Sequence, residues 1–164
     1  MNIFVLDTNP LRAAQDHCDK HVVKMIVESA QMLSFAHHAV GSVVPNMYAA
    51  AKSHMVHPCT LWVRESSANY KWLYELALAL SEQYTERYHK IHKTQREVLR
   101  HLWRIPPGYA SRIKTPHVLC MPDYLHKKNK VEAYRDFYVT KEFTHTNYRH
   151  SPTPLWLLHR IGKD

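Results

Sequence analysis

Glycine, cysteine and long apolar runs are all scarce in this chain of 164 residues. Three glycines are too few for a collagen-like repeat or a flexible linker, and no glycine-rich phosphate loop occurs. Three cysteines, none in a CxxC pair, argue against a disulfide framework or a thiolate zinc knuckle and favour a reducing compartment. The apolar runs fall far short of the roughly 20 residues of a membrane helix, and the start MNIFVLD lacks the flanks of a signal peptide. We therefore expect a globular cytoplasmic protein with no membrane segment.

Positive charge is abundant. Lys and Arg number 22 against 14 acidic residues, a formal net charge of +8, and this excess is typical of proteins that contact phosphates. It predicts a nucleic-acid partner, although a basic surface can also serve only to keep a protein in solution. The 14 histidines widen the possible chemistry, because imidazoles bind metals, carry protons and contact phosphates.

The pattern of apolar residues predicts a mainly α fold, one compact helical domain over residues 1–164 with long irregular loops. Residues 2–6 are expected to be extended. Helices are expected from Pro10 towards Gly41 with a break near Asp16, and over 68–92, 95–103, 131–143 and 153–161. The segment 42–58 is predicted to be a loop with one helical turn at 47–52, and Thr94 with Glu97 has the spacing of a capping box. The residues expected to face the core include Val22, Met25, Ile26, Ala30, Leu33, Tyr70, Leu73, Ala77, Leu80, Tyr84 and Ile91.

A row of polar residues follows the first long helix. His17, His21, Lys24, Glu28 and Gln31 are spaced by four, three, four and three residues, so they share one helical face. The row could be a solvated face with a Lys24–Glu28 ion pair. It could equally be a working site, because a carboxylate, an amine and imidazoles on one rigid helix suit acid–base or Schiff-base chemistry.

Two further readings concern metal and thiol chemistry. His17 and His21 could share one ion, with a second pair at His54 and His57, but HExxH is absent and no further ligand is apparent. We expect no metal and no cofactor. Cys18 lies among basic neighbours, yet a buried structural thiol is the favoured interpretation.

Aromatic and polar side chains are interleaved in the segment 57–72. His57, Trp62, Arg64, Asn69 and Tyr70 could hold a flipped or unpaired base by stacking and hydrogen bonding. His17 and Gln31 of the polar row are expected to bind the same substrate. Core packing is the alternative for Trp62 and Tyr70, since large aromatics dominate protein interiors.

Basic residues recur around the end of the helix expected over 68–92. Arg87, Lys90, Lys93 and Arg96 are predicted to contact the nucleic-acid backbone. A solvated helix face would show the same pattern.

Several blocks resemble a family of small bacteriophage proteins of no stated activity: MNIFVLDTNP, CDKHVVKMIVESAQMLS, HPCTLWVRESSANYKWLYEL, YTERYHKIHKT, CMPDY and VEAYRDFY. A more distant resemblance is to the pyrimidine-dimer DNA glycosylases of the endonuclease V type, which are small, basic and all-α. It is carried by the N-terminal start, a helix-borne glutamate, and the pairs His57–Pro58 and Arg87–Tyr88.

The second resemblance implies a mechanism. In those glycosylases the N-terminal α-amine attacks the sugar C1′ and a helix glutamate supports the imine chemistry, which here would be the Met1 amine and Glu28. Asn2 is too bulky for routine removal of the initiator methionine, so the amine would be that of Met1 itself, or Lys24 would take its place.

We therefore predict a phage-encoded enzyme that acts in the cytoplasm of an infected host cell. It is expected to be a DNA N-glycosylase, with or without lyase activity, that removes damaged or modified bases, with Glu28, Lys24, His21 and Met1 as catalytic residues. The alternatives are a non-catalytic nucleic-acid-binding accessory protein and a metal-dependent nucleotide or phosphodiester hydrolase. The oligomeric state is left open.

Overall fold

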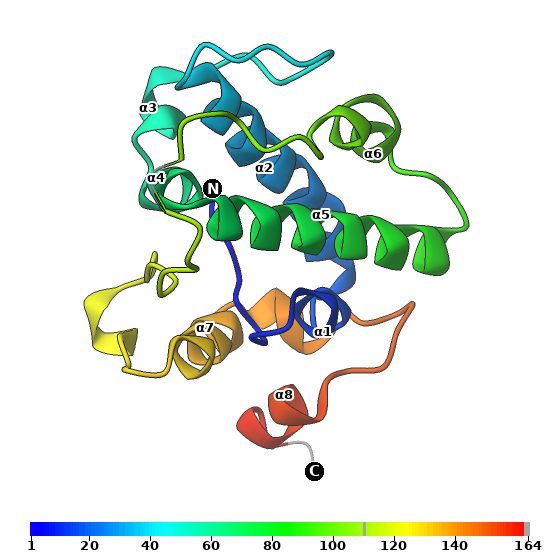
Figure 1. Cartoon of the computed structure of the whole chain (residues 1–164). Coiled ribbons are helices and arrows are strands. Elements are labelled where there is room, and N and C mark those ends of the chain that lie inside the picture. Colours follow the sequence, from blue (N-terminus) through cyan, green and yellow to red (C-terminus); the bar gives the residue numbers. More distant parts are fainter. Residues whose placement is uncertain (110, 163–164) are drawn as a thin grey trace.

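Helices are the regular elements of the structure, a computed structural model that describes residues 1–109 and 111–162. No strand occurs in these residues, which confirms the mainly α class (Figure 1). The expected domain of 1–164 also includes residues 110, 163 and 164, which lie outside the described part. None of the described helices combines the length and apolar character needed to cross a membrane. The elements are α1 (Pro10–Gln15), α2 (Asp19–His38), α3 (Lys52–Met55), α4 (Pro58–Glu65), α5 (Ser67–Tyr88), α6 (Lys93–Glu97), α7 (Lys130–Val139) and α8 (Leu155–Arg160), with 3₁₀ turns at Leu99–His101, Asp123–Leu125 and Glu142–His145.

The first long helical stretch is divided where the sequence predicts a break. α1 begins at Pro10 and is capped by the Asn9 side chain, which accepts from backbone N–H groups of the first turn. The chain then turns at 16–18 before α2 begins. α2 ends shortly before Gly41, whose φ of +66° is the left-handed conformation that glycine adopts most easily.

α2 and α5 form the centre of the core and share the largest helix–helix interface (Figure 1). The residues predicted to face the core on both helices are buried, apart from Tyr84, which is half-buried. Ser66 caps α5 by accepting from Asn69 N at 3.1 Å, and α5 ends at Tyr88 because His89 adopts a left-handed conformation. Ile91 therefore lies beyond the helix and is 61% exposed, so its assignment to the core is wrong.

Three local predictions need correction. α4 was not expected, since Pro58 resembled a loop residue, but proline is well accommodated in the first turn of a helix. The turn predicted at 47–52 lies instead at α3. The capping box of Thr94 and Glu97 does not form: His92 caps α6, its Nδ1 accepting from Thr94 N at 3.1 Å.

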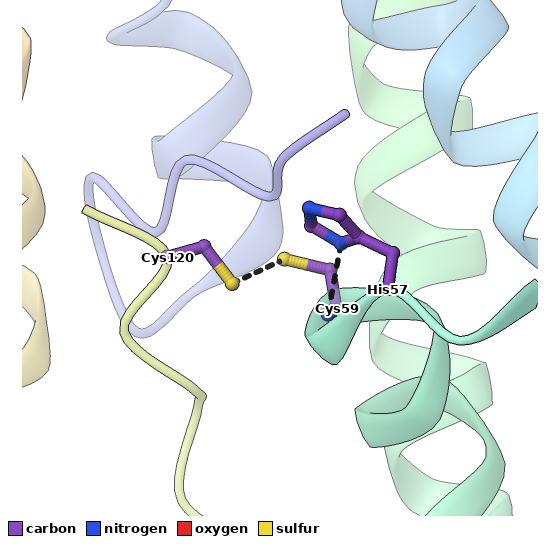
Figure 2. Close-up of side chains that lie close together, drawn as sticks. All are labelled: His57, Cys59 and Cys120. Carbon is purple, nitrogen blue, oxygen red and sulfur yellow. Dashed lines mark hydrogen bonds between the residues drawn. The ribbon is translucent and has the colours of Figure 1, made fainter. Parts of the chain in front are cut away.

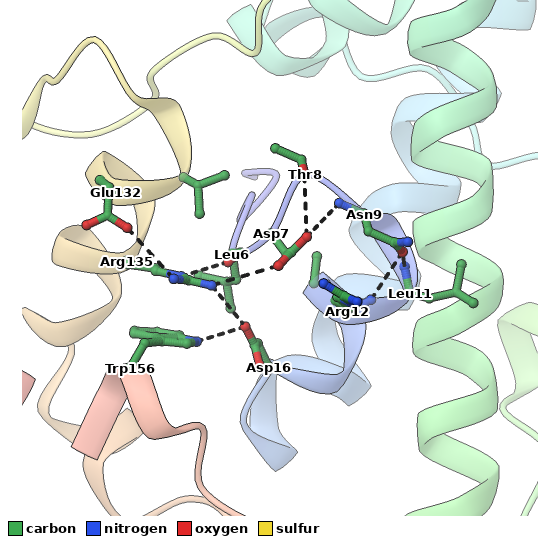
Figure 3. Close-up of polar contacts among 12 residues, drawn as sticks. Leu6, Asp7, Thr8, Asn9, Leu11, Arg12, Asp16, Glu132, Arg135 and Trp156 are labelled. Atoms are coloured by element: carbon green, nitrogen blue, oxygen red, sulfur yellow. Dashed lines mark hydrogen bonds and ion pairs between the residues drawn. The ribbon is translucent and has the colours of Figure 1, made fainter. Parts of the chain in front are cut away.

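The N-terminal segment is extended and buried, and it lies against α7. Figure 3 shows how its far end is fixed: Arg135 of α7 donates from Nε to Leu6 O at 2.8 Å and forms ion pairs with Asp7 and Asp16. Asp16 also accepts from Trp156 of α8 at 2.8 Å. The guanidinium thus joins the N-terminal segment, the end of α1 and the C-terminal helices, and it limits where the first residues can lie.

Candidate active site

The N-terminus is held inside the protein by the side chain and backbone of Asn2. Asn2 Nδ2 donates to Cys120 O at 2.8 Å, and Asn2 Oδ1 accepts from Tyr134 OH at 3.2 Å. The backbone N–H of Asn2 donates to Glu28 Oε2 at 3.0 Å. With Arg135 fixing the segment at Leu6, the first residues are fastened at both ends, so the position of the α-amine is well defined.

Glu28 lies between two amines. Its Oε2 is 3.9 Å from the α-amine of Met1, and its Oε1 is 3.3 Å from Lys24 Nζ. The Glu28 side chain is 13% exposed and that of Met1 3% exposed, whereas Lys24 is 59% exposed. The carboxylate therefore lies between the α-amine of a residue whose side chain is buried and the ammonium group of a largely exposed lysine.

These groups border a cavity of about 290 Å³. Phe4, Phe137 and Phe143 give it aromatic walls, and Lys20 and Lys141 add ammonium groups near its rim. Lys141 Nζ is 4.2 Å from the centre of the Phe137 ring, and Lys20 Nζ is 4.8 Å from that of Phe143. Aromatic faces beside fixed cations match the chemistry of a base next to a phosphate.

His21 forms part of the same wall as a neutral ring. Burial, followed by the charge of neighbouring His17 and of nearby lysines, lowers the pKa of His21 to about 3. Its ring stacks on Phe4 with centroids 4.7 Å apart, and its Nδ1 lies 2.9 Å from Tyr138 OH. Because protonation is disfavoured here, the ring is suited to shaping the cavity, and the expected role as a proton shuttle is not favoured.

The cavity thus brings together Met1, His21, Lys24 and Glu28, the four residues predicted to be catalytic. Gln31, the last member of the polar row, is half-buried and lies outside the lining.

Five other residues predicted to contact nucleic acid are buried in the structure, so as they lie they offer no surface for such a contact. His17, Trp62, Asn69 and Tyr70 are fully buried and Arg87 is 5% exposed. His17 lies at the break between α1 and α2, where its Nδ1 donates to Ala13 O at 2.6 Å. Burial lowers the pKa of His17 to about 4.

The buried aromatic and amide residues near α4 have structural partners. Trp62 stacks on His117 with centroids 4.3 Å apart. Asn69 accepts from Thr115 N at 2.9 Å and donates to Trp62 O at 2.8 Å. Tyr70 OH donates to the Leu102 carbonyl at 2.7 Å. This is the core-packing alternative, realised for both large aromatics.

Arg87 is an internal cross-link. Its Nη1 lies 3.1 Å from Asp19 Oδ1 and donates to His17 O at 2.8 Å, while Nη2 donates to Gln15 O and Gln83 Oε1. Because Arg87 is buried and both of its terminal nitrogens donate inside the protein, it has no exposed face for a phosphate.

The remaining predicted contacts are exposed and separate from the cavity lining. Arg64 is exposed on α4, Lys90 lies between α5 and α6, and Lys93 and Arg96 lie within α6. Glu97 pairs with Lys93 at 3.8 Å and with Arg96 at 3.2 Å.

His57 lies next to the N-terminal amine. It caps α4 by accepting from Cys59 N at 3.2 Å, and burial followed by the positive charge of the α-amine lowers its pKa. Together with Cys59 and Cys120 it forms a group of donors that could hold a metal ion.

A wider depression of about 610 Å³ lies elsewhere, and its size alone does not make it the better candidate. Its one carboxylate, Glu97, already pairs with Lys93 and Arg96. Its lining is Asn46, Tyr48, Lys93, Thr94, Glu97 and Val98.

Sequence reasoning identified as site residues only four of the eleven residues that line the cavity. Phe137, Lys141 and Phe143 come from the C-terminal third of the chain and reach Glu28 only through the packing of α7 against the N-terminal segment. Lys20 could have been predicted as part of the site, because it precedes Lys24 by one helical turn and so lies on the same helical face.

A positioned amine beside a carboxylate, in a cavity with aromatic walls, has the parts needed for nucleophilic attack followed by imine chemistry.

The family model for pyrimidine dimer DNA glycosylase matches residues 1–96, which is more than half of the chain. The chain belongs to this family, and DNA is the substrate or partner that the family implies. No curated protein and no solved structure shows a significant match. The matched region contains Met1, Lys24 and Glu28, whereas the aromatic wall supplied by Phe137 and Phe143 lies beyond it.

Proposed function

We propose that the protein is a glycosylase that excises damaged pyrimidines from DNA, with the α-amine of Met1 as the nucleophile and with lyase activity on the resulting intermediate. The observation that carries this proposal is the enclosed α-amine 3.9 Å from Glu28 Oε2 at the edge of a cavity. The phage-like sequence blocks favour action in an infected bacterial cell.

The reaction follows from the groups present. The lone pair of the Met1 amine forms a bond to C1′ of the sugar, the glycosidic bond breaks, and the base leaves with the electron pair and takes up a proton. Glu28 accepts a proton from the attacking amine. Opening of the sugar ring then gives an imine, from which loss of a C2′ proton and expulsion of the 3′ phosphate cleave the strand.

Met1 is favoured over Lys24 by its fixed position. Asn2 holds the α-amine in one place, whereas the Lys24 ammonium is largely solvated.

The cavity size favours one nucleotide unit. At about 290 Å³ it lies near the lower end of small-molecule sites, which begin at about 300 Å³. A sugar and a single base extruded from the duplex would fit this volume better than two linked bases. Lys20 and Lys141 are placed to meet the flanking phosphates.

The test is base release and strand cleavage on duplex DNA that contains one pyrimidine dimer, compared with the undamaged duplex. Glu28→Gln should lower turnover by about 10²- to 10⁴-fold, the usual contribution of a positioned acid–base group, while leaving DNA binding in place. Glu75→Gln is the matched control, because Glu75 pairs with Lys71 at the same helical spacing at 3.7 Å.

Wild-type turnover that survives Glu28→Gln would contradict the proposed role of the carboxylate. An inactive but folded wild-type protein on a panel of damaged bases, with salt-sensitive DNA binding, would favour the non-catalytic alternative.

A further inference from the structure

Three donor groups from two distant parts of the chain meet beside the N-terminal segment. His57 and Cys59 belong to the first turn of α4, and Cys120 comes from the irregular chain before α7. One donor atom from each residue lies within 4.8 Å of the other two (Figure 2). The family match ends at residue 96, so Cys120 lies outside it.

The donor set is that of a thiophilic cation. Two thiolates and one imidazole suit zinc and its relatives, whereas magnesium and calcium prefer oxygen ligands. Zinc bonds of about 2.3 Å to sulfur and 2.0 Å to nitrogen place tetrahedral ligand atoms roughly 3.3 to 3.8 Å apart. Cys59 Sγ lies 3.2 Å from Cys120 Sγ, so a small separation of the two sulfurs would admit an ion.

The fold already holds the donors in place. α4 fixes His57 and Cys59 in one turn, and the backbone of Cys120 is hydrogen bonded on both sides, donating to Tyr134 OH at 3.3 Å and accepting from Asn2 Nδ2 at 2.8 Å. Cys59 is buried, while His57 and Cys120 are half-buried. The cluster is thus enclosed by protein yet accessible from one side.

One existing contact would change on metal binding. His57 Nδ1 accepts from Cys59 N at 3.2 Å, so a metal bound through Nε2 would require a proton on Nδ1 and the loss of this cap. A single long hydrogen bond is a small loss beside ligation by two thiolates and an imidazole.

We propose that His57, Cys59 and Cys120 form a binding site for one thiophilic divalent cation, with zinc as its occupant. Each thiol releases its proton to solvent when the sulfur binds the ion. The fourth coordination position faces the N-terminal segment, where Asn2 Oδ1 lies 3.7 Å from Cys59 Sγ. The bound ion would link α4 to the chain at Cys120, on either side of the Asn2 side chain. This proposal does not depend on the identity of the nucleophile.

The probe is cobalt(II), added to reduced protein from which metals have been removed by a chelator. We expect one equivalent to bind, with the thiolate-to-cobalt charge-transfer band and the intense visible bands of a tetrahedral sulfur-containing site. Zinc should abolish these bands by displacement, and magnesium or calcium should leave them unchanged.

Cys59→Ser and Cys120→Ser should each weaken cobalt binding by more than about 100-fold, because loss of a direct ligand exceeds the loss of an outer partner. Cys18→Ser is the matched control and should bind cobalt as the wild type does, since Cys18 lies at the start of α2 with its backbone N–H bonded to Tyr138 OH. Circular dichroism of each variant separates loss of the site from loss of the fold. If the buried Cys59→Ser variant fails to fold, the half-buried Cys120→Ser variant and His57→Ala decide the question.

Absence of the charge-transfer band in the reduced wild type would overturn the proposal. So would a band that persists in folded Cys120→Ser, or one that is lost in folded Cys18→Ser. Isolation of the protein with a Cys59–Cys120 disulfide, combined with no cobalt uptake after reduction, would show that the pair is a redox couple and not a metal site.

Discussion

Two carboxylates of the same helix, Asp19 and Glu28, each face a cation, but in different surroundings. The Asp19–Arg87 pair is sealed, with side chains 6% and 1% exposed, and Asp19 Oδ2 also accepts from backbone N–H groups at 149 and 150. Glu28 instead meets the α-amine and Lys24 at the edge of a cavity. The Asp19–Arg87 pair leaves no space for a substrate, whereas the Glu28 carboxylate and its two amines border a cavity that a substrate could enter. A charged pair is therefore a candidate for catalysis only where, as at Glu28, a cavity beside it can admit a substrate.

The largest expected effect is on the free energy of unfolding, which the Asp19–Arg87 pair should support much more than Glu28 does. Arg87→Ala leaves the Asp19 carboxylate buried without its partner and also removes contacts to Gln15 and His17, so we expect a loss of about 3–5 kcal/mol in the free energy of unfolding. Glu28→Gln should change stability by much less, since its surroundings are partly solvated. Urea denaturation of both variants measures the difference. Equal destabilisation by the two changes would break the comparison.

The second prediction concerns pH. Burial lowers the pKa of His17 to about 4 and those of His21 and His117 to about 3, while an unfolded histidine titrates near 6.5. The unfolded state therefore binds protons first as the pH falls. Stability is fully present above about pH 6.5 and should fall by up to about 1.4 kcal/mol per pH unit for each of these histidines, down towards pH 4.

His17→Gln should flatten this dependence by up to one histidine's share, because glutamine can still donate a hydrogen bond but does not titrate. The exposed His54→Gln is its control and should leave the slope unchanged. Denaturation midpoints at pH 7, 6 and 5 supply the measurement. A slope that is the same in wild type and His17→Gln would mean that His17 is protonated in the folded protein.

A smaller effect is expected at the exposed basic residues. Arg87 is buried, so of the four residues predicted to contact phosphates only Lys90, Lys93 and Arg96 are exposed. Reversing these three charges should lower DNA affinity by about tenfold and reduce its dependence on salt, with the fold intact. Binding titrations at several salt concentrations provide the test. Unchanged affinity and salt dependence would show that DNA contacts the protein elsewhere, with the lysines around the cavity as the next candidates.

The smallest effect is expected for Lys24→Ala. The pair with Glu28 is largely solvated, so its removal should change stability by only a few tenths of a kcal/mol, comparable with Lys71→Ala in the control pair on α5. Base excision should continue, because Glu28 still faces the α-amine. Loss of all excision in folded Lys24→Ala would transfer the nucleophilic role to Lys24.

The sequence predicts the helical core well, and it predicts part of the site. The apolar periodicity of α2 and the Ser66 cap are local properties, and both agree with the structure. The contact between Lys24 and Glu28 is likewise local, because residues four apart on one helix are neighbours. The convergence of Met1 on Glu28 came only from the resemblance to a known family, because no local pattern shows where an extended N-terminus will lie.

Long-range packing explains what the sequence could not reveal. Arg87 has the composition of a phosphate contact, and only the approach of Asp19 and of the chain between α1 and α2 turns it into an internal cross-link. Cys59 and Cys120 are 61 residues apart, so spacing rules for metal ligands could not pair them. Trp62 has the side chain of a base-stacking residue, but His117, 55 residues away in the sequence, stacks on its ring.

The most direct test of the central claim is borohydride trapping on dimer-containing DNA, followed by proteolysis and mass spectrometry of the cross-linked peptide. If the enclosed α-amine is the nucleophile, reduction of the imine will leave the sugar on the Met1 nitrogen, and prior acetylation of that amine will prevent the adduct. An adduct mapped to Lys24, or one that forms unchanged on the acetylated protein, would contradict the account.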